Sequence, residues 1–450
     1  MAMLAALFLF AAPSFALEVF PSHGHVRAIR FEAEGAVVET AGGEFRVPGL
    51  SPVSGAAEQG GCRYETTEAG VRRRCGSRDE LVPVGGFAAS GVALYRDELF
   101  VGTYGGGLRR LYGGRVGGIP DSVTALAATN SGLLCGTEDG LYRLGPSGVS
   151  RLDPPSLPAP NISALATGGD ALWIGSFDGG LASLASGVWR RWRVADGLPS
   201  DWIDDLAFDG EKLWGATEKG VFWIVDGRVA RPEAEELRKP TSAVFAAGGK
   251  VYLAQAGRVL VLSPEGLRAV EIPEKHPQRV WADGGEIWVA GLRGLYRVRG
   301  KAVERFGASD KRLPADWVTA IAPWEGGFLV GTYDGGLVHL SPEGAPRPVL
   351  DKAWVNLGAI ASSNGRVAVG EMEGGLWLQD GGAWRHLRRE DGLPSNDVTA
   401  VAFEKDALWI GTREGLARLA MEGPRHAQGA ETGEDTARIA LRPTGALGAE

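Results

Sequence analysis

The stretch LWIGTREGLARL at residues 408–419 decides the fold, because variants of it recur along the chain. LWIGSFDGGLASL stands at 172–184, LWGATEKGVFWI at 213–224 and FLVGTYDGGLVHL at 328–340. Each variant has a short apolar run with a Gly, then a Ser or Thr, a turn, and a second apolar run. Repetition at a fixed period is typical of repeat architectures, in which every copy is one structural unit.

The copies align on the residue that ends the apolar run, and neighbours lie 34 (Thr103 to Thr137) to 41 (Ser176 to Thr217) residues apart. These anchor residues are Thr67, Thr103, Thr137, Ser176, Thr217, Gln255, Gly291, Thr332, Glu371 and Thr412. Four short strands in about forty residues is the layout of a propeller blade. The sequence therefore predicts an all-β fold, a single β-propeller of nine or ten four-stranded blades. An eight-bladed ring with an N-terminal extension is the alternative.

The apolar runs predict strands that are covered on both faces, because each blade of a propeller packs against its neighbours. Trp173, Trp214, Trp288 and Trp409 share one position in four copies. A large ring at that position fills the space between blades, so we expect these four residues in the core and not in a ligand site.

Two longer phrases carry a family resemblance: WRRWRVADGLPSDWI at 189–203 and WRHLRREDGLPSNDVTAVA at 384–402. With the LWIGT copies, they resemble the two-component regulator propeller repeat over about residues 50–420. The resemblance implies a propeller with a sensing or binding role, since such repeats commonly form the extracytoplasmic sensing part of histidine kinases. The sequence shows no kinase core, no DNA-binding region and no transmembrane helix. We therefore expect a membrane-bound sensor partner to carry any signal.

The N-terminal sequence MAMLAALFLFAAPSFA predicts a signal peptide cleaved after Ala16, and a buried N-terminal segment is the alternative. The mature chain is then periplasmic or secreted, with no membrane insertion after cleavage. The net charge of −8 argues against a nucleic-acid partner. The expected organisation is a signal peptide at 1–16, strands that close the ring at 17–50, propeller repeats at 51–423 and a flexible tail at 424–450.

A disulfide is predicted in the first copy. With a two-residue turn at Glu68–Ala69, Cys62 and Cys75 face each other on neighbouring strands. A non-hydrogen-bonded pair there holds Cα atoms roughly 4.5 Å apart, which is within disulfide reach. Cys135 lies in an apolar run and is expected to be a buried thiol.

The candidate ligand site lies on one face of the propeller. Alternate connections of antiparallel strands lie on opposite faces, so the turn before each inner strand shares a face with the turn between its second and third strands. Aromatic and carboxylate side chains there suit stacking and directed hydrogen bonds. The candidate residues before inner strands are Asp201, Trp202, Asp316, Trp317 and Trp354, with Asn356 and Asn396, and those in the Gly turns are Tyr104, Phe177, Asp178, Tyr333 and Asp334. The alternative is that the Asp and Asn residues bond the turn backbone.

The leading interpretation is an exported, sensor-like propeller that binds a small polar ligand, glycan or peptide at this face. The alternative is an enzyme, a lyase or glycan-active hydrolase, with its site in the same central funnel. A weaker option is an interaction platform that uses the rim. No catalytic motif is present, and His23 and His25 lack a third ligand nearby, so the sequence predicts no catalytic residue, no metal site and no cofactor.

Overall fold

The computed structural model describes residues 17–20, 22, 26–40, 43–50, 57–152, 156–341, 346–381 and 383–421. Apart from three short 3-10 helices, η1 (Val194–Asp196), η2 (Glu235–Arg238) and η3 (Arg389–Asp391), the regular elements in these ranges are strands. The all-β class and the four-stranded blade are confirmed. The expected signal peptide at 1–16, the tail at 424–450, and His23 and His25 lie outside the described residues. None of the described helices is long and apolar enough to span a bilayer.

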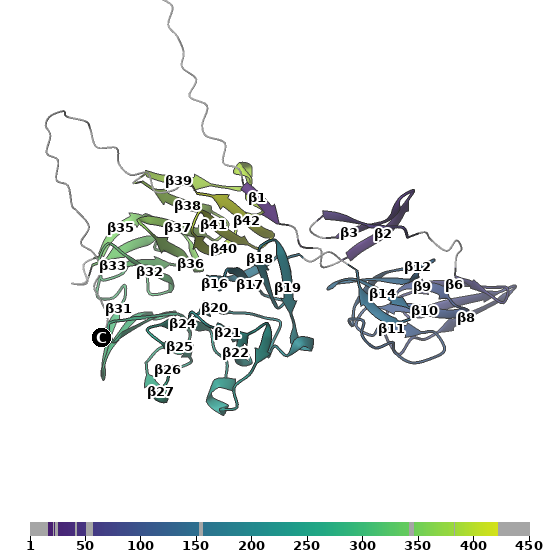
Figure 1. The fold of residues 1–450 in the computed structure, drawn as a ribbon, viewed down its shortest axis with the longest axis horizontal. Helices are drawn as coiled ribbons and strands as arrows, with labels where there is room; N and C mark the ends of the chain where they lie inside the picture. Colours follow the sequence, from purple (N-terminus) through teal and green to yellow (C-terminus); the bar gives the residue numbers. More distant parts are fainter. Residues whose placement is uncertain are drawn as a thin grey trace, which may run out of the picture.

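Seven of the described sheets form a ring, seen at the left of Figure 1. Their inner strands contact one another in the order β16, β20, β24, β28, β32, β36, β40 and back to β16. The strands of the ring are β16 (Ile162–Gly168), β17 (Ala171–Ser176), β18 (Leu181–Ala185), β19 (Val188–Trp192), β20 (Asp205–Phe208), β21 (Leu213–Thr217), β22 (Gly220–Val225), β23 (Arg228–Ala230), β24 (Ala243–Ala247), β25 (Lys250–Gln255), β26 (Arg258–Ser263), β27 (Gly266–Glu271), β28 (Pro277–Asp283), β29 (Glu286–Gly291), β30 (Gly294–Arg299), β31 (Ala302–Phe306), β32 (Val318–Trp324), β33 (Gly327–Thr332), β34 (Leu337–Leu340), β35 (Pro346–Leu350), β36 (Val355–Ser363), β37 (Arg366–Glu371), β38 (Gly375–Asp380), β39 (Ala383–Leu387), β40 (Val398–Glu404), β41 (Ala407–Thr412), β42 (Gly415–Ala420) and β1 (Leu17–Phe20).

The other four described sheets form a separate row, at the right of Figure 1, which we call the four-sheet unit. Its strands are β2 (Val26–Glu32), β3 (Gly35–Thr40), β4 (Gly43–Pro48), β5 (Glu58–Gln59), β6 (Cys62–Thr67), β7 (Gly70–Cys75), β8 (Arg78–Val82), β9 (Ala89–Tyr95), β10 (Glu98–Thr103), β11 (Gly107–Arg110), β12 (Val123–Thr129), β13 (Gly132–Thr137), β14 (Gly140–Gly145) and β15 (Gly148–Arg151). Contacts run from β6 to β9, β12 and then β2. The blades predicted as one series of nine or ten are thus divided into a ring of seven and this row.

Charged outer faces account for the division. On the sheet β2–β4, Arg30 lies 3.1 Å from Glu39 and 2.8 Å from Glu44. On the sheet β5–β8, Arg74 lies 3.1 Å from Glu65 and 3.5 Å from Asp79. A sheet whose outer face carries ion pairs ends a stack of repeats, because a further blade would have to bury those charges.

The ten anchor residues all end the second strand of their sheet, as the alignment predicts. Where the anchor is Thr or Ser, its hydroxyl donates to a Gly carbonyl at the end of the turn, as in Thr332 to Gly336 at 2.9 Å and Thr412 to Gly415 at 2.9 Å. The hydroxyl therefore fixes the tight turn that follows the strand. The sheet β2–β4 was not among the ten aligned copies, and its second strand ends at Thr40.

The repeat Gly sets the spacing between blades. A Cβ at Gly175 would lie 2.8 Å from the side chain of Ile203, and one at Gly331 would lie 2.4 Å from Val355. Each of these partners begins the next blade. Of the four shared Trp residues, Trp214, Trp288 and Trp409 are buried and Trp173 is half-buried, so their placement in the core is confirmed.

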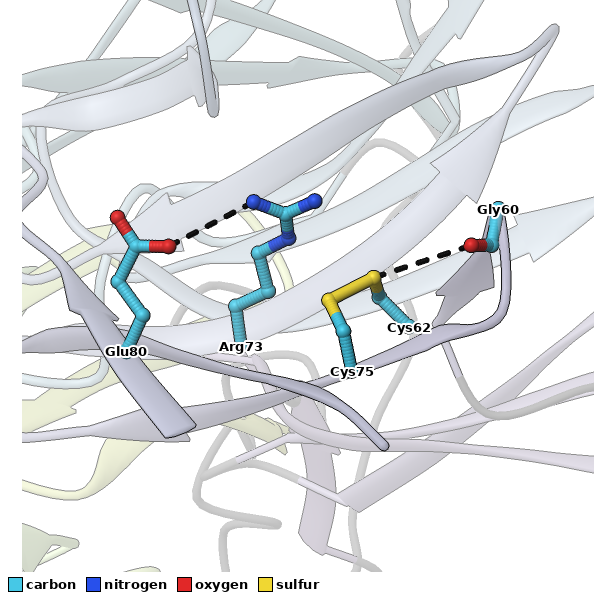
Figure 2. Close-up of a disulfide and its surroundings, with 5 residues drawn as sticks. All are labelled: Gly60, Cys62, Arg73, Cys75 and Glu80. Carbon is cyan, nitrogen blue, oxygen red and sulfur yellow. Dashed lines mark hydrogen bonds and ion pairs between the residues drawn. A yellow bond between two sulfur atoms is a disulfide. The ribbon is translucent and has the colours of Figure 1, made fainter. Parts of the chain in front are cut away.

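Of the strands expected at 17–50 to close the ring, β1 does so: it pairs with β42 in antiparallel register, Leu17 facing Leu419, and completes the last blade. Strands β2–β4 do not, because they pack on β12 in the four-sheet unit. Cys62 and Cys75 form a disulfide with Cα atoms 4.2 Å apart, and Figure 2 shows it beside the Arg73–Glu80 ion pair. Cys135 is a buried free thiol.

Candidate functional site

Three predicted aromatic residues meet on the loop face of the ring, defined by the turns before its inner strands and between its second and third strands. The ring of Trp317 stacks on Tyr333 at 4.1 Å between centroids, and Tyr333 stacks on Trp354 at 5.7 Å. Trp317 and Trp354 precede β32 and β36, and Tyr333 lies in the β33–β34 turn. Trp354 is 50% exposed. The indole Nε1 of Trp317 is buried and has no hydrogen-bond partner within the described residues.

A second aromatic pair lies two blades away around the ring from this stack. Phe177 and Trp202 meet edge to face with centroids 5.4 Å apart. Trp202 is 48% exposed. The loop face therefore offers half-exposed aromatic surface at two places on one ring.

The carboxylates and amides before inner strands hold turns together. Asp201 accepts from the backbone N–H of Val194 at 2.9 Å, and Asp316 accepts from Ala308 at 2.8 Å. Asn396 accepts from Arg389 at 2.7 Å in the matching turn. These contacts fit the alternative in which such residues bond the turn backbone.

The remaining predicted residues are dispersed. Asn356 donates to Asp397 of the next blade at 2.7 Å. Asp334 is exposed on the loop face, beside Tyr333 in sequence. Asp178 borders a cavity of about 460 Å³ with Arg193 and Asp139, which pair at 3.0 Å. Tyr104, 52% exposed, belongs to the four-sheet unit, so the fold does not bring it into the ring stack.

Asp204, also on the loop face, is not among the residues that the sequence predicted for the site. It borders a pocket of about 280 Å³ together with Glu218 and His276. Burial first, and the nearby Glu218 second, raise the pKa of Asp204 to about 7, while Arg279 acts in the opposite direction. Its neighbour Asp205 turns into the protein, where it accepts from Val244 at 3.0 Å, and burial raises its pKa also.

A larger cavity of about 900 Å³ opens on the opposite face of the ring, at the turns that join first and second strands. Trp281, Trp288, Trp324 and Phe328 line it, with Asp283 and Arg297. The sequence predicted no site there, because the shared Trp position is expected in the core. No group of three or more possible metal ligands occurs among the residues that the structure describes.

Comparison with known proteins supports the fold. No protein-family model and no curated protein matches this chain. It is similar to PorZ, a bacterial surface component of the type-IX secretion system of Porphyromonas gingivalis, with 13% identity, a TM-score of 0.57, and coverage of 91% of this chain and 88% of that structure. It is also similar to the extracellular domain of BT4673 from B. thetaiotaomicron, a proposed hybrid two component system. There the identity is 14%, the TM-score 0.50, and the match covers 88% of this chain but 64% of the other.

Proposed function

We propose that the chain is an exported, sensor-like binding propeller that recognises a small polar ligand, a glycan or a peptide at the loop face of its ring. The observation that carries the proposal is the stack of Trp317, Tyr333 and Trp354. Trp354 is exposed, while Trp317 and Tyr333 are half-buried, and rings fixed by their neighbours in this way give a flat and rigid surface. Such a surface stacks on sugar rings or aromatic groups at little entropic cost.

Export is supported by the Cys62–Cys75 disulfide, because such bonds persist in oxidising compartments. We propose the periplasm or the exterior as the location, and a membrane-bound sensor as the partner that receives the signal. The match to an extracellular domain, that of BT4673, is compatible with this proposal.

Calorimetric titration with panels of oligosaccharides and peptides tests the binding role. Trp354→Ala removes a half-exposed ring, so it is expected to weaken binding at least tenfold with no change in unfolding midpoint. Tyr112→Ala removes an exposed ring from the four-sheet unit and serves as the matched control. Unchanged affinity in both Trp354→Ala and Trp317→Ala would disprove the aromatic site.

A second candidate function, an acid–base enzyme acting on the same loop face, is favoured by Asp204. A carboxyl with a pKa of about 7 can donate and accept a proton near neutral pH, and Glu218 and His276 border the same pocket. Asp204→Asn should abolish any lyase or hydrolase activity found in a substrate screen. Retained activity in that variant would remove Asp204 from the mechanism.

A further inference from the structure

The 900 Å³ cavity lies at the end of the ring away from the loop face. Its rim is formed by the turns between the first and second strands of three successive blades, at Asp283–Gly284, Glu325–Gly326 and Asn364–Gly365. Its volume lies in the range of pockets that enclose drug-sized ligands. This site is independent of the one proposed for the loop face.

Aromatic rings form the walls of the cavity. Phe328 lies edge to face with Trp281, 4.7 Å between centroids, and 4.8 Å from Trp288. Trp324, on the same blade as Phe328, completes the aromatic lining. Trp281, Trp324 and Phe328 are half-buried, so part of each ring faces the opening.

The strand register arranges these rings and the charges in two parallel rows on one face of the blade β28–β31. Trp281 faces Trp288, which faces Arg297. Two residues nearer the turn between β28 and β29, Asp283 faces Glu286, which faces Arg299. Alternate residues of a strand share a face, so an aromatic row runs beside an acidic row.

The wall of the cavity already binds one cation of the chain itself. The guanidinium of Arg297 lies over the ring of Trp288 at 5.0 Å. It also donates to both carboxylate oxygens of Glu286, at 2.8 and 3.0 Å. A ring face and a carboxylate together thus hold a cation here, the two attractions expected of a cation–π site.

The part of the cavity wall formed by Trp281 and Asp283 holds no cation of this kind from the described residues. Trp281 and Asp283 repeat the ring-and-carboxylate pair, and Trp324 provides another ring. Among the described residues no Arg or Lys lies over Trp281 or Trp324, and none pairs with Asp283. We propose that this cavity is a second ligand site, which binds an organic ammonium cation against Trp281 and Trp324 with Asp283 as its counter-charge.

The charges of the cavity select against other ligands. The basic residues nearby already have acidic partners: Arg297 and Arg299 both pair with Glu286, Arg297 also lies 4.0 Å from Glu304, and Arg347 pairs with Glu325 at 3.2 Å. An anion would approach Asp283 with no free basic group to receive it. A neutral ligand of the same shape would contact the rings but would lose the attraction of the carboxylate.

Calorimetric titration of the chain with choline and with 3,3-dimethylbutan-1-ol, its neutral isostere, tests the proposal. Choline is expected to bind at least tenfold more tightly than the isostere, because only choline carries the charge. Trp324→Ala should weaken choline binding about tenfold, and Asp283→Asn about fivefold. Asp283 is exposed, so its substitution tests the site even if Trp324→Ala fails to fold.

Asp406→Asn is the matched control, since Asp406 is an exposed carboxylate in the corresponding turn of the last blade and does not line the cavity. Its choline affinity should equal that of the parent chain. Equal binding of choline and the isostere, equal choline affinity in Asp283→Asn and the parent, or no heat with choline at millimolar concentration would each overturn the proposal. Because Trp354→Ala alters only the loop face, its choline affinity should not change.

Discussion

The hydroxyl of Thr399 donates to the backbone carbonyl oxygen of Ile162 at 2.6 Å, although 237 residues separate them. Thr399 lies at the bulge that follows the first residue of β40, and Ile162 begins β16. Ser242 makes the same bond to Pro277 of the next blade, also at 2.6 Å. The seam between the last and first blades of the ring is therefore built like a seam between blades that are consecutive in the chain.

The repeat Gly of the last blade contacts the same Ile162. A Cβ at Gly411 would lie 2.6 Å from its Cγ2 atom, and Ile162 is fully buried. Gly411→Ala should therefore lower the free energy of unfolding by about 1–3 kcal/mol through overpacking, measured by urea denaturation. Gly117→Ala, where a Cβ meets nothing within 4 Å, should change it by less than about 0.5 kcal/mol. Equal effects in the two variants would contradict the close contact between Gly411 and Ile162 at the seam between the last and first blades.

Phe20 should anchor the ring-closing strand. Its ring packs on Trp409 at 5.4 Å and on Trp189 at 6.1 Å. Phe20→Ala is expected to lower the free energy of unfolding by about 2 kcal/mol, less than for a fully buried Phe because Phe20 is half-buried. Hydrogen exchange should then rise in β42, whose edge β1 covers. Val19→Ala, at a 49% exposed position of the same strand, is the control and should leave β42 protected.

The disulfide should stabilise the four-sheet unit and leave the ring unaffected. It closes a loop of 13 residues, for which chain entropy gives about 3 kcal/mol. Cys62→Ala with Cys75→Ala should therefore raise the hydrogen exchange of β6 and β7 with no change in β32 or β36. Alkylation of the folded, unreduced chain should leave Cys135 unlabelled, because it is buried. Labelling of Cys62 or Cys75 under those conditions would contradict the disulfide.

Asp204 should make stability fall as the pH rises. Its pKa is about 7 in the folded chain against 3.8 for the ordinary carboxyl, so the folded state holds the proton more tightly. The contribution is complete below pH 4 and is lost as the pH rises through 7, by up to about 4 kcal/mol at 1.4 kcal/mol per unit. Asp204→Asn should flatten the dependence of unfolding free energy on pH between 4 and 7. A residual slope from the buried Asp205 is expected, and an unchanged slope would contradict the assignment.

The sequence by itself determined the blade. The apolar run, the repeat Gly and the anchor Thr act within one blade or on its neighbour, so their spacing alone predicted the second strands and their turns. The pairing of Cys62 with Cys75 followed in the same way, because a two-residue turn sets the register of a hairpin. The aromatic residues of the loop-face site could be predicted for the same reason, because the position of a turn within the repeat determines the face of the propeller on which the turn lies.

Only the tertiary structure decided how many blades share a ring and where the larger cavity lies. Every blade has similar edges and faces, so the repeats in the sequence do not reveal which blade packs against the last one to close the ring. That choice depends on contacts such as Gly411 with Ile162 and on the ion pairs that end the four-sheet unit. The cavity depends on how Phe328 packs between Trp281 and Trp288 across two blades. From a repeat pattern alone, each of these aromatic side chains is expected in the core. Only the packing of the two blades against each other leaves a cavity beside the side chains.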